Sequence, residues 1–355
     1  MKFAILGAGN GGQTMAAYLT SLGHQVALYD IDSEKLKALR DRKTIFLSGV
    51  LNIENAPAVI AESIREAVEG ADMVMVTTTA DAHYDVAVAI APHLKANQTV
   101  VLHPGAVLGA LLFRNTLIKC GVRECPIIAE VQDLVFTCRS KVPGEITVSG
   151  IKKRLKLSAL PASAAQSVVN SLKDVFNQFI PAENLLETGL SFTSSVSHPA
   201  PMLLNTGRIE SGEAFEYYNE GITDSVSLVM EKIDAERIAI GKAFGLDLIS
   251  VLESQKQKYG ISAENLHSAY QQNTAFRGIM APKTMSHRFL FEDVPAGMVP
   301  LSALGKLTGI PTPAMDAIIT LSCIVAGKNY WSVGRSLNQL GLEGKNKEQL
   351  VEIVS

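Results

Sequence analysis

A glycine-rich hexapeptide follows the first apolar run of the chain and limits the folds that are open to it. Residues 7–12 read Gly-Ala-Gly-Asn-Gly-Gly, between an expected strand at 2–6 and a helical pattern at 13–22. In that setting Gly7 permits a tight turn, Gly9 lets the backbone approach a pyrophosphate, and Gly12 brings helix and strand close together. The helix N-terminus offers unpaired N–H groups to phosphates. The pattern predicts a dinucleotide site formed by Gly7, Ala8, Gly9, Asn10, Gly11 and Gly12.

An acidic residue ends the second apolar run, at residues 25–30. Asp30 stands where a carboxylate accepts both ribose hydroxyls of the adenosine half of a dinucleotide and repels a 2′-phosphate. Residues 31–34, Ile-Asp-Ser-Glu, contain no arginine that could receive such a phosphate. The sequence therefore predicts NAD(H) rather than NADP(H). The alternative, a glycine-rich turn that binds nothing, is disfavoured because the motif, its flanking pattern and the acid occur together.

The first half of the chain alternates short apolar runs with helical patterns, which is typical of βαβ units and a parallel sheet. We expect strands at 2–7, 25–30, 73–77, 99–102 and 127–131, which are rich in Val, Ile, Leu and Met, as strands covered on both faces are. Residues 145–158 alternate better and predict an antiparallel addition, followed by a helix at 163–178 and a short strand near 185–187. Together these patterns predict a doubly wound, mostly parallel Rossmann domain over residues 1–188.

Polar residues follow two of the expected strands, where the rest of a dinucleotide should lie. Thr77 closes the run that begins at Met73, and His103, Pro104 and Gly105 follow the run at 99–102. We predict that Thr77, Pro104 and Gly105 line the nicotinamide, although a polar loop without a ligand explains the threonine equally well. His103 is either a catalytic acid or, as we favour, a residue packed beside the cofactor.

The second half of the chain shows helical patterns without the alternating strand patterns of the first half. Helical spacing marks residues 224–244, and Gly245 is suited to the position just beyond a helix end. Further helices are expected at 262–276, 301–308, 313–326 and 347–354, several introduced by Pro or Ser. No strand pattern of comparable quality occurs after residue 190. The sequence therefore predicts an all-α C-terminal domain over residues 189–355.

The composition excludes several functional classes. Hydrophobic residues make up 47% and the net charge is only -3, so a large core is expected and nucleic acid is a poor partner. The basic stretch at 152–156 is best explained as a solvated strand end or turn. Four scattered cysteines indicate a reducing compartment and no metal site. No stretch resembles a signal peptide or a membrane span, so we expect a cytoplasmic protein that binds no membrane, and the apolar composition favours a homodimer.

Several segments resemble the opine (octopine/nopaline) dehydrogenase family, and the match covers essentially the whole chain. These segments are residues 7–12, 103–105 (His-Pro-Gly), 136–139 (Phe-Thr-Cys-Arg), 198–199 (His-Pro), 203–205 (Leu-Leu-Asn), 215–221 (Phe-Glu-Tyr-Tyr-Asn-Glu-Gly) and 288–294 (Arg-Phe-Leu-Phe-Glu-Asp-Val). The resemblance implies a helical substrate domain behind the Rossmann domain. It also implies condensation of an amino acid with a 2-oxo acid, usually pyruvate, and reduction of the imine by NAD(P)H. The compact length resembles the bacterial branch that makes N-(1-carboxyethyl) amino acids.

The resemblance also assigns roles to residues of the second half. His198 alone would more often be structural, although Pro199 places it at the mouth of a helix and disfavours the α conformation for it. By resemblance His198 is the catalytic histidine and Asp293 its partner, and imidazole titrates at a pH suited to moving protons during reductive amination. Arg288 suits a carboxylate or the cofactor pyrophosphate, and His198, Asn205 and Tyr218 are predicted to bind substrate. The chain departs from the family pattern at His103, where asparagine is expected, and no motif selects the amino acid.

Two other functions are compatible with a dinucleotide-binding domain. A reductase of the ketopantoate-reductase type would act on a 2-oxo acid or hydroxy acid and usually carries a lysine on the first helix of its second domain. The helix that opens at His198 contains no lysine through Arg208, which argues against this class. A non-catalytic NAD(H)-sensing module would need a surface for a partner or DNA, and the sequence shows none.

Overall fold

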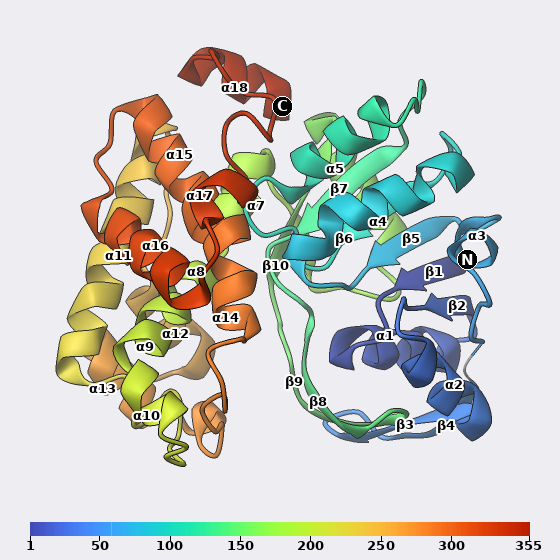
Figure 1. Cartoon of the computed structure of the whole chain (residues 1–355). Coiled ribbons are helices and arrows are strands. Elements are labelled where there is room, and N and C mark those ends of the chain that lie inside the picture. Colours follow the sequence, from blue (N-terminus) through green and yellow to red (C-terminus); the bar gives the residue numbers. More distant parts are fainter. Residues whose placement is uncertain (58) are drawn as a thin grey trace. The chain divides into compact units, whose positions relative to one another are not determined.

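The computed structural model describes residues 1–57 and 59–355 (Figure 1). The chain forms two compact units. Unit 1 comprises Met1–Gly189 together with the last three residues, Ile353–Ser355, and unit 2 comprises Leu190–Glu352. The division of function between a cofactor domain over 1–188 and a substrate domain over 189–355 stays a prediction.

A seven-stranded sheet forms the centre of unit 1. Its order is β11-β10-β7-β6-β5-β1-β2, and all neighbours are parallel except β7 and β10, which are antiparallel. The strands are β1 (Lys2–Leu6), β2 (Gln25–Tyr29), β5 (Met73–Val76), β6 (Thr99–Leu102), β7 (Ile127–Val131), β10 (Leu155–Leu160) and β11 (Phe179–Pro181). The five expected parallel strands are all present, and the apolar runs of β1, β5, β6 and β7 are mostly buried, whereas the edge strand β2 is buried at alternate residues. This confirms the predicted Rossmann architecture.

Helices alternate with the strands of unit 1 along the chain, and the last of them, α7, ends at the first residue of unit 2. They are α1 (Asn10–Ser21), α2 (Ser33–Arg42), α3 (Ile64–Val68), α4 (His83–Ile90), α5 (Gly109–Lys119), α6 (Ala165–Leu172) and α7 (Leu185–Leu190). One apolar core joins the sheet to α1, to α6 and to a second sheet, with Phe3, Met15, Val101, Val148 and Phe176 among its buried members.

The second sheet of unit 1 has four strands in the order β4-β3-β9-β8. They are β3 (Thr44–Gly49), β4 (Ile53–Pro57), β8 (Phe136–Val142) and β9 (Glu145–Ile151). In Figure 1 the β8–β9 hairpin reaches β3 and β4. The expectation of one antiparallel element at 145–158 was therefore wrong in part. This stretch divides into β9 and β10, which belong to different sheets, because the charged residues 152–154 lie between them, where Lys152 pairs with Asp133.

Two further expectations for unit 1 were wrong. The helix expected at 163–178 is the shorter α6, and the strand expected near 185–187 is the helix α7, with the strand β11 lying earlier. The side chain of Asn184 explains the helix, because its Oδ1 accepts hydrogen bonds from Leu186 N at 2.9 Å and Glu187 N at 3.3 Å. An asparagine that accepts hydrogen bonds from these N–H groups favours the start of a helix, even where an apolar run that resembles a strand follows it.

The regular elements that the structure describes in unit 2 are helices joined by loops, with one isolated bridge between Glu216 and Met280. Its helices are α8 (Ser194–Ser197), α9 (Pro199–Leu204), α10 (Thr206–Glu210), α11 (Asp224–Ala243), α12 (Val251–Tyr259), α13 (Leu266–Gln272), α14 (Arg288–Phe291), α15 (Val299–Thr308), α16 (Pro313–Ala326) and α17 (Tyr330–Val333). The last helix, α18 (Lys347–Val354), ends in residues of unit 1. The helix expected at 262–276 is the shorter α13 followed by a 3₁₀ turn at Thr274–Phe276, because a capping box at Asn265 starts the helix there.

Candidate active site

The glycine loop between β1 and α1 has the geometry that a pyrophosphate site needs. Gly7 has a left-handed φ of 108°, and a Cβ added to Gly12 would lie 1.7 Å from the carbonyl oxygen of Gly7. No described atom lies within 4 Å of a Cβ added to Gly9, so the backbone there is open to a ligand. Thr77 supports the loop, since its hydroxyl donates to Gly7 O at 2.8 Å. The loop therefore fits a dinucleotide at Gly9, while Gly7 and Gly12 are required by the fold.

Asp30 lies against this loop, directly after β2. Its Oδ2 accepts a hydrogen bond from Ala8 N at 2.6 Å, and its Oδ1 accepts one from Asp32 N at 2.9 Å. The ammonium of Lys35 lies 3.2 Å from Asp30 Oδ2 and 3.5 Å from Asp32 Oδ2. This cation lies one residue beyond the segment 31–34, from which the absence of a phosphate partner was predicted. Asp30 is therefore held where the acceptor for the ribose hydroxyls should be, and Lys35 compensates part of its negative charge.

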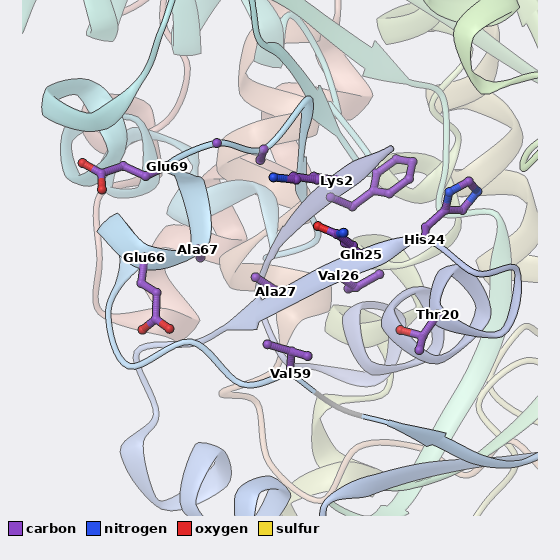
Figure 2. Close-up of a pocket in the computed structure, with 13 residues that line it drawn as sticks. Lys2, Thr20, His24, Gln25, Val26, Ala27, Val59, Glu66, Ala67 and Glu69 are labelled. Atoms are coloured by element: carbon purple, nitrogen blue, oxygen red, sulfur yellow. The ribbon is translucent and has the colours of Figure 1, made fainter.

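A surface hollow of about 470 Å³ lies elsewhere in unit 1 (Figure 2). It is lined by residues that include Lys2, Gln25, Glu66 and Glu69, at the amino ends of β1 and β2. Parallel α/β sheets bind dinucleotides at the carboxyl ends of their strands, at the opposite edge. This hollow is therefore separate from the predicted cofactor site.

His103 follows β6 and is buried, with 2% of its surface exposed. Its Nε2 lies 3.3 Å from the sulfur of Met75, and its Nδ1 has no hydrogen-bond partner in the described part of the chain. Burial lowers the pKa of His103 to about 3. The imidazole is therefore neutral near pH 7 and lacks the second ring proton that an imidazolium acid would donate, so the packing role stays the prediction.

Pro104 and Gly105 begin a tight loop that leads to α5. A Cβ added to Gly105 would lie 2.4 Å from the Cβ of Glu130, so only glycine fits. Glu130 is fully buried at the end of β7. This carboxylate could not be predicted as part of the site, because an acid inside an apolar strand carries no local signal of its contacts.

The predicted catalytic residue of unit 2 is His198, which lies between α8 and α9. Its Nδ1 lies 2.7 Å from Asp293 Oδ2 and its Nε2 lies 3.0 Å from the hydroxyl of Tyr218. Asp293 is 1% exposed and His198 is 8% exposed. The structure thus brings together the predicted catalytic pair and one predicted substrate-binding residue, from positions far apart in the sequence.

The backbone of His198 is helical, with φ −111° and ψ −56°. The expectation that Pro199 would keep His198 out of the α region was therefore wrong. The His198 N–H donates to Ser194 O at 3.0 Å, and its carbonyl accepts a hydrogen bond from the Tyr217 hydroxyl at 2.5 Å. These two contacts compensate for the steric preference of a residue before proline.

Aromatic rings surround the imidazole. Phe289 stacks on His198, with ring centroids 4.0 Å apart, and Tyr270 and Phe276 stack on Tyr218. Burial, together with the charge of Asp293 and the neighbouring tyrosines, raises the pKa of Tyr217 well above its usual value, and burial raises the pKa of Tyr270 to about 12. Both hydroxyls therefore stay protonated and act as hydrogen-bond donors. Tyr217 and Phe289 lie in motifs quoted above, but of these aromatic residues only Tyr218 was given a role from the sequence.

Two other predicted residues have contacts that differ from their expected roles. The amide nitrogen of Asn205 donates to Pro201 O at 2.9 Å and to Gly221 O at 2.8 Å, which ties α9 to the segment that carries Tyr218. Arg288 is exposed, and its Nη1 lies 3.0 Å from Glu292 Oε2. Substrate binding by Asn205 and cofactor binding by Arg288 stay predictions. Among the residues that the structure describes, no three His, Cys, Asp or Glu side chains gather as a metal site would require.

Known protein families match both units. Residues 2–106 match the NAD binding domain of 6-phosphogluconate dehydrogenase, and residues 181–326 match the α-helical domain of NAD/NADP octopine/nopaline dehydrogenase. The opine dehydrogenase of Arthrobacter sp. (strain 1C) is 42% identical over 343 residues, which cover 96% of this chain and 95% of that protein. The chain belongs to the opine dehydrogenase family. It is an NAD-dependent oxidoreductase that acts on a CH–NH bond, as the resemblance implied.

Solved structures agree on the fold of the family. An octopine dehydrogenase in complex with NADH and agmatine matches with a TM-score of 0.80 at 22% identity, covering 96% of each chain. A ketopantoate reductase from Ralstonia eutropha JMP134 matches with a TM-score of 0.64 at 20% identity, covering 93% of this chain. The two-domain fold is thus shared with the alternative reductase class, whereas the sequence match decides for opine dehydrogenase. Within residues 1–57 and 59–355, no helix is long and apolar enough to cross a membrane.

Proposed function

We propose that this opine dehydrogenase joins an amino acid to pyruvate, with His198 as the group that moves protons. The contact between His198 Nδ1 and Asp293 Oδ2, at 2.7 Å, carries the proposal. Solved octopine dehydrogenase structures that hold NADH with L-arginine and NADH with pyruvate support the substrate classes. In the reaction the amine nitrogen bonds to the carbonyl carbon and the carbonyl oxygen leaves as water. One hydride and one proton then convert the imine to a secondary amine.

His198 has the chemistry that these proton transfers need. The Asp293 carboxylate accepts from Nδ1–H, which fixes the tautomer and leaves Nε2 as the basic nitrogen. Nε2 then takes a proton from the attacking amine and returns it to the departing oxygen. Phe289 covers one face of the ring, so the imidazole is held in one orientation.

The hydroxyl of Tyr218 occupies the hydrogen-bonding position on Nε2. With Nδ1 protonated, Nε2 accepts from this hydroxyl, so the tyrosine marks where a substrate oxygen or nitrogen would approach the imidazole. We propose that Tyr218 binds the substrate at this point, either by sharing Nε2 or by moving to donate to the substrate itself.

The chain's own residues fit the nicotinamide cofactor in unit 1. The open backbone at Gly9 would receive the pyrophosphate, and Asp30 would accept the ribose hydroxyls. When bound, NADH supplies the hydride.

The homodimer expected from composition stays a prediction. On α16, the side chains of Leu321, Ile324 and Val325 are exposed. A contact between two copies of the chain would bury such a face, and sedimentation of the purified protein would show whether the dimer exists.

The test of the proposed function is NADH oxidation with pyruvate and a panel of amino acids. We expect oxidation to require both co-substrates and to yield the secondary amine, identified by mass. Oxidation with pyruvate alone at the same rate would indicate a simple ketoacid reductase and overturn the proposal.

A further inference from the structure

Glu130 is a buried carboxylate that the proposed chemistry does not use. It lies near the carboxyl end of β7 and none of its surface is exposed. Removing a carboxylate from water is unfavourable unless hydrogen-bond donors replace the water. The position of Glu130 therefore requires specific partners.

Both carboxylate oxygens have such partners. Oε2 accepts from Ala110 N at 2.8 Å, one of the N–H groups in the first turn of α5 that have no partner within the helix. Oε1 accepts from the Thr188 hydroxyl at 2.7 Å, which itself lies 2.7 Å from the hydroxyl of Ser158. Glu130 thus joins the start of α5 to the end of the segment that precedes unit 2.

The loop between β6 and α5 lies directly on this carboxylate. Gly105 approaches the side chain so closely that an added Cβ would lie 2.4 Å from Glu130 Cβ. Ala106 and Leu108 both have φ of 56°, a left-handed conformation that non-glycine residues adopt only where their surroundings impose it. A Cβ added to Gly189 would lie 3.2 Å from Val107 Cα, so the backbone beside Thr188 supports the same loop.

This loop lies on the side of the sheet that should hold the nicotinamide. Asp30, at β2, marks the adenosine side, and β5 and β6 lie on the other side of β1 in the strand order. A dinucleotide whose pyrophosphate lies at the start of α1 must therefore extend its nicotinamide half over the carboxyl ends of β5 and β6. Pro104 and Gly105 follow β6 directly.

We propose that Glu130 is a positioning residue for the nicotinamide half of the cofactor. Its carboxylate holds residues 104–108 in the strained conformation that contacts this half, while the adenosine half does not depend on it. The proposal rests on the proposed cofactor role of unit 1.

The experiment compares two probes, NADH and ADP-ribose, because ADP-ribose lacks the nicotinamide. In Glu130→Leu, which has no acceptor for Ala110 N–H, we expect NADH affinity to fall at least tenfold and ADP-ribose affinity to change less than twofold. Glu130→Gln keeps an acceptor for Ala110 and should bind NADH within about threefold of the original protein. Val100→Ala, at a buried position of β6, serves as the control for general destabilisation and should not separate the two probes.

Thr188 gives a second test if Glu130→Leu fails to fold. Thr188→Val removes the donor to Oε1 and should weaken NADH several-fold more than ADP-ribose, whereas Thr188→Ser keeps the hydroxyl and should keep the affinity. Equal losses for both probes, or no loss in Glu130→Leu and Thr188→Val, would overturn the positioning role. If the original protein bound neither probe, the proposed cofactor site itself would fail, which is a different result.

Discussion

At the scale of single residues, the pairing of His198 with Asp293 leads to the first prediction. His198→Ala should lower turnover by roughly two to four orders of magnitude, the span typical of general acid–base catalysis. Asp293→Asn should also lower turnover, because the amide no longer stabilises a protonated imidazole. The double variant should be hardly slower than His198→Ala, since the two residues act as one unit. Steady-state kinetics measures this, and losses that multiply would show that Asp293 acts independently.

The contact between Asp30 and Lys35 leads to the second prediction, which concerns the choice of cofactor. NADH should bind more tightly than NADPH because Asp30 opposes a 2′-phosphate. Lys35→Gln should widen this preference by about tenfold, because it leaves two carboxylates uncompensated beside the phosphate. Dissociation constants from cofactor fluorescence test this, with Lys37→Gln, an exposed lysine paired with Asp41, as the matched control. Equal affinities for NADH and NADPH in the original protein would remove Asp30 from this role.

The buried imidazole of His103 leads to the third prediction, a dependence of stability on pH. Its pKa is about 3 in the folded protein and 6.5 in the unfolded chain, so below pH 6.5 the unfolded chain binds a proton that the folded chain does not. Stability should therefore fall as pH drops from 6.5 towards 3, by an amount on the order of 4 kcal/mol from this residue. His103→Asn should flatten this part of the profile in denaturant unfolding. An unchanged slope between pH 6.5 and 4 would contradict the assignment.

At the scale of elements, glycine has two different roles in the turn from β1 into α1: Gly9 leaves room for the cofactor, and Gly12 allows close packing on Gly7. Gly9→Val should fold, because nothing described lies within 4 Å of its Cβ and its φ of −73° suits valine, yet it should abolish NADH binding by filling the pyrophosphate approach. Gly12→Ala should instead lower the thermal midpoint, since its Cβ would overlap Gly7 O at 1.7 Å. Calorimetry and NADH titration distinguish the two effects. Normal NADH binding by Gly9→Val would show that the loop holds no cofactor.

At the scale of the whole molecule, a buried ion pair of unit 2 connects segments that are distant in the sequence. Arg237, on α11, is 1% exposed and donates to Asp234 Oδ1 at 2.8 Å, to Leu190 O at 2.5 Å and to Ile249 O at 2.8 Å. Arg237→Met leaves Asp234 without its cation in a buried site and should lower the free energy of unfolding by about 3 kcal/mol. The same substitution at the exposed Arg65, paired with Glu69, should cost less than about 1 kcal/mol. Similar urea midpoints for the two variants would contradict this account.

The sequence alone determined the features that depend on neighbouring residues. The glycine loop, the buried parallel strands and α11 were predictable because backbone conformation and apolar periodicity act within a few residues. The position of Asp30 directly after β2 was predictable for the same reason, while its contact with the ribose stays a prediction. The helix α7 could not be predicted from its apolar run, because the capping bond of Asn184 decided it.

Only the tertiary structure decided what depends on contacts between distant residues. His198 and Asp293 are 95 residues apart, and family resemblance, rather than any local pattern, paired them before the fold was known. The second sheet joins β3 to β9 across about a hundred residues, and Glu130 meets Thr188 over 58. Such contacts form because burying apolar surface and pairing buried polar groups stabilises one arrangement of the whole chain. This free energy depends on contacts throughout the chain, so it cannot be inferred from any short stretch of sequence.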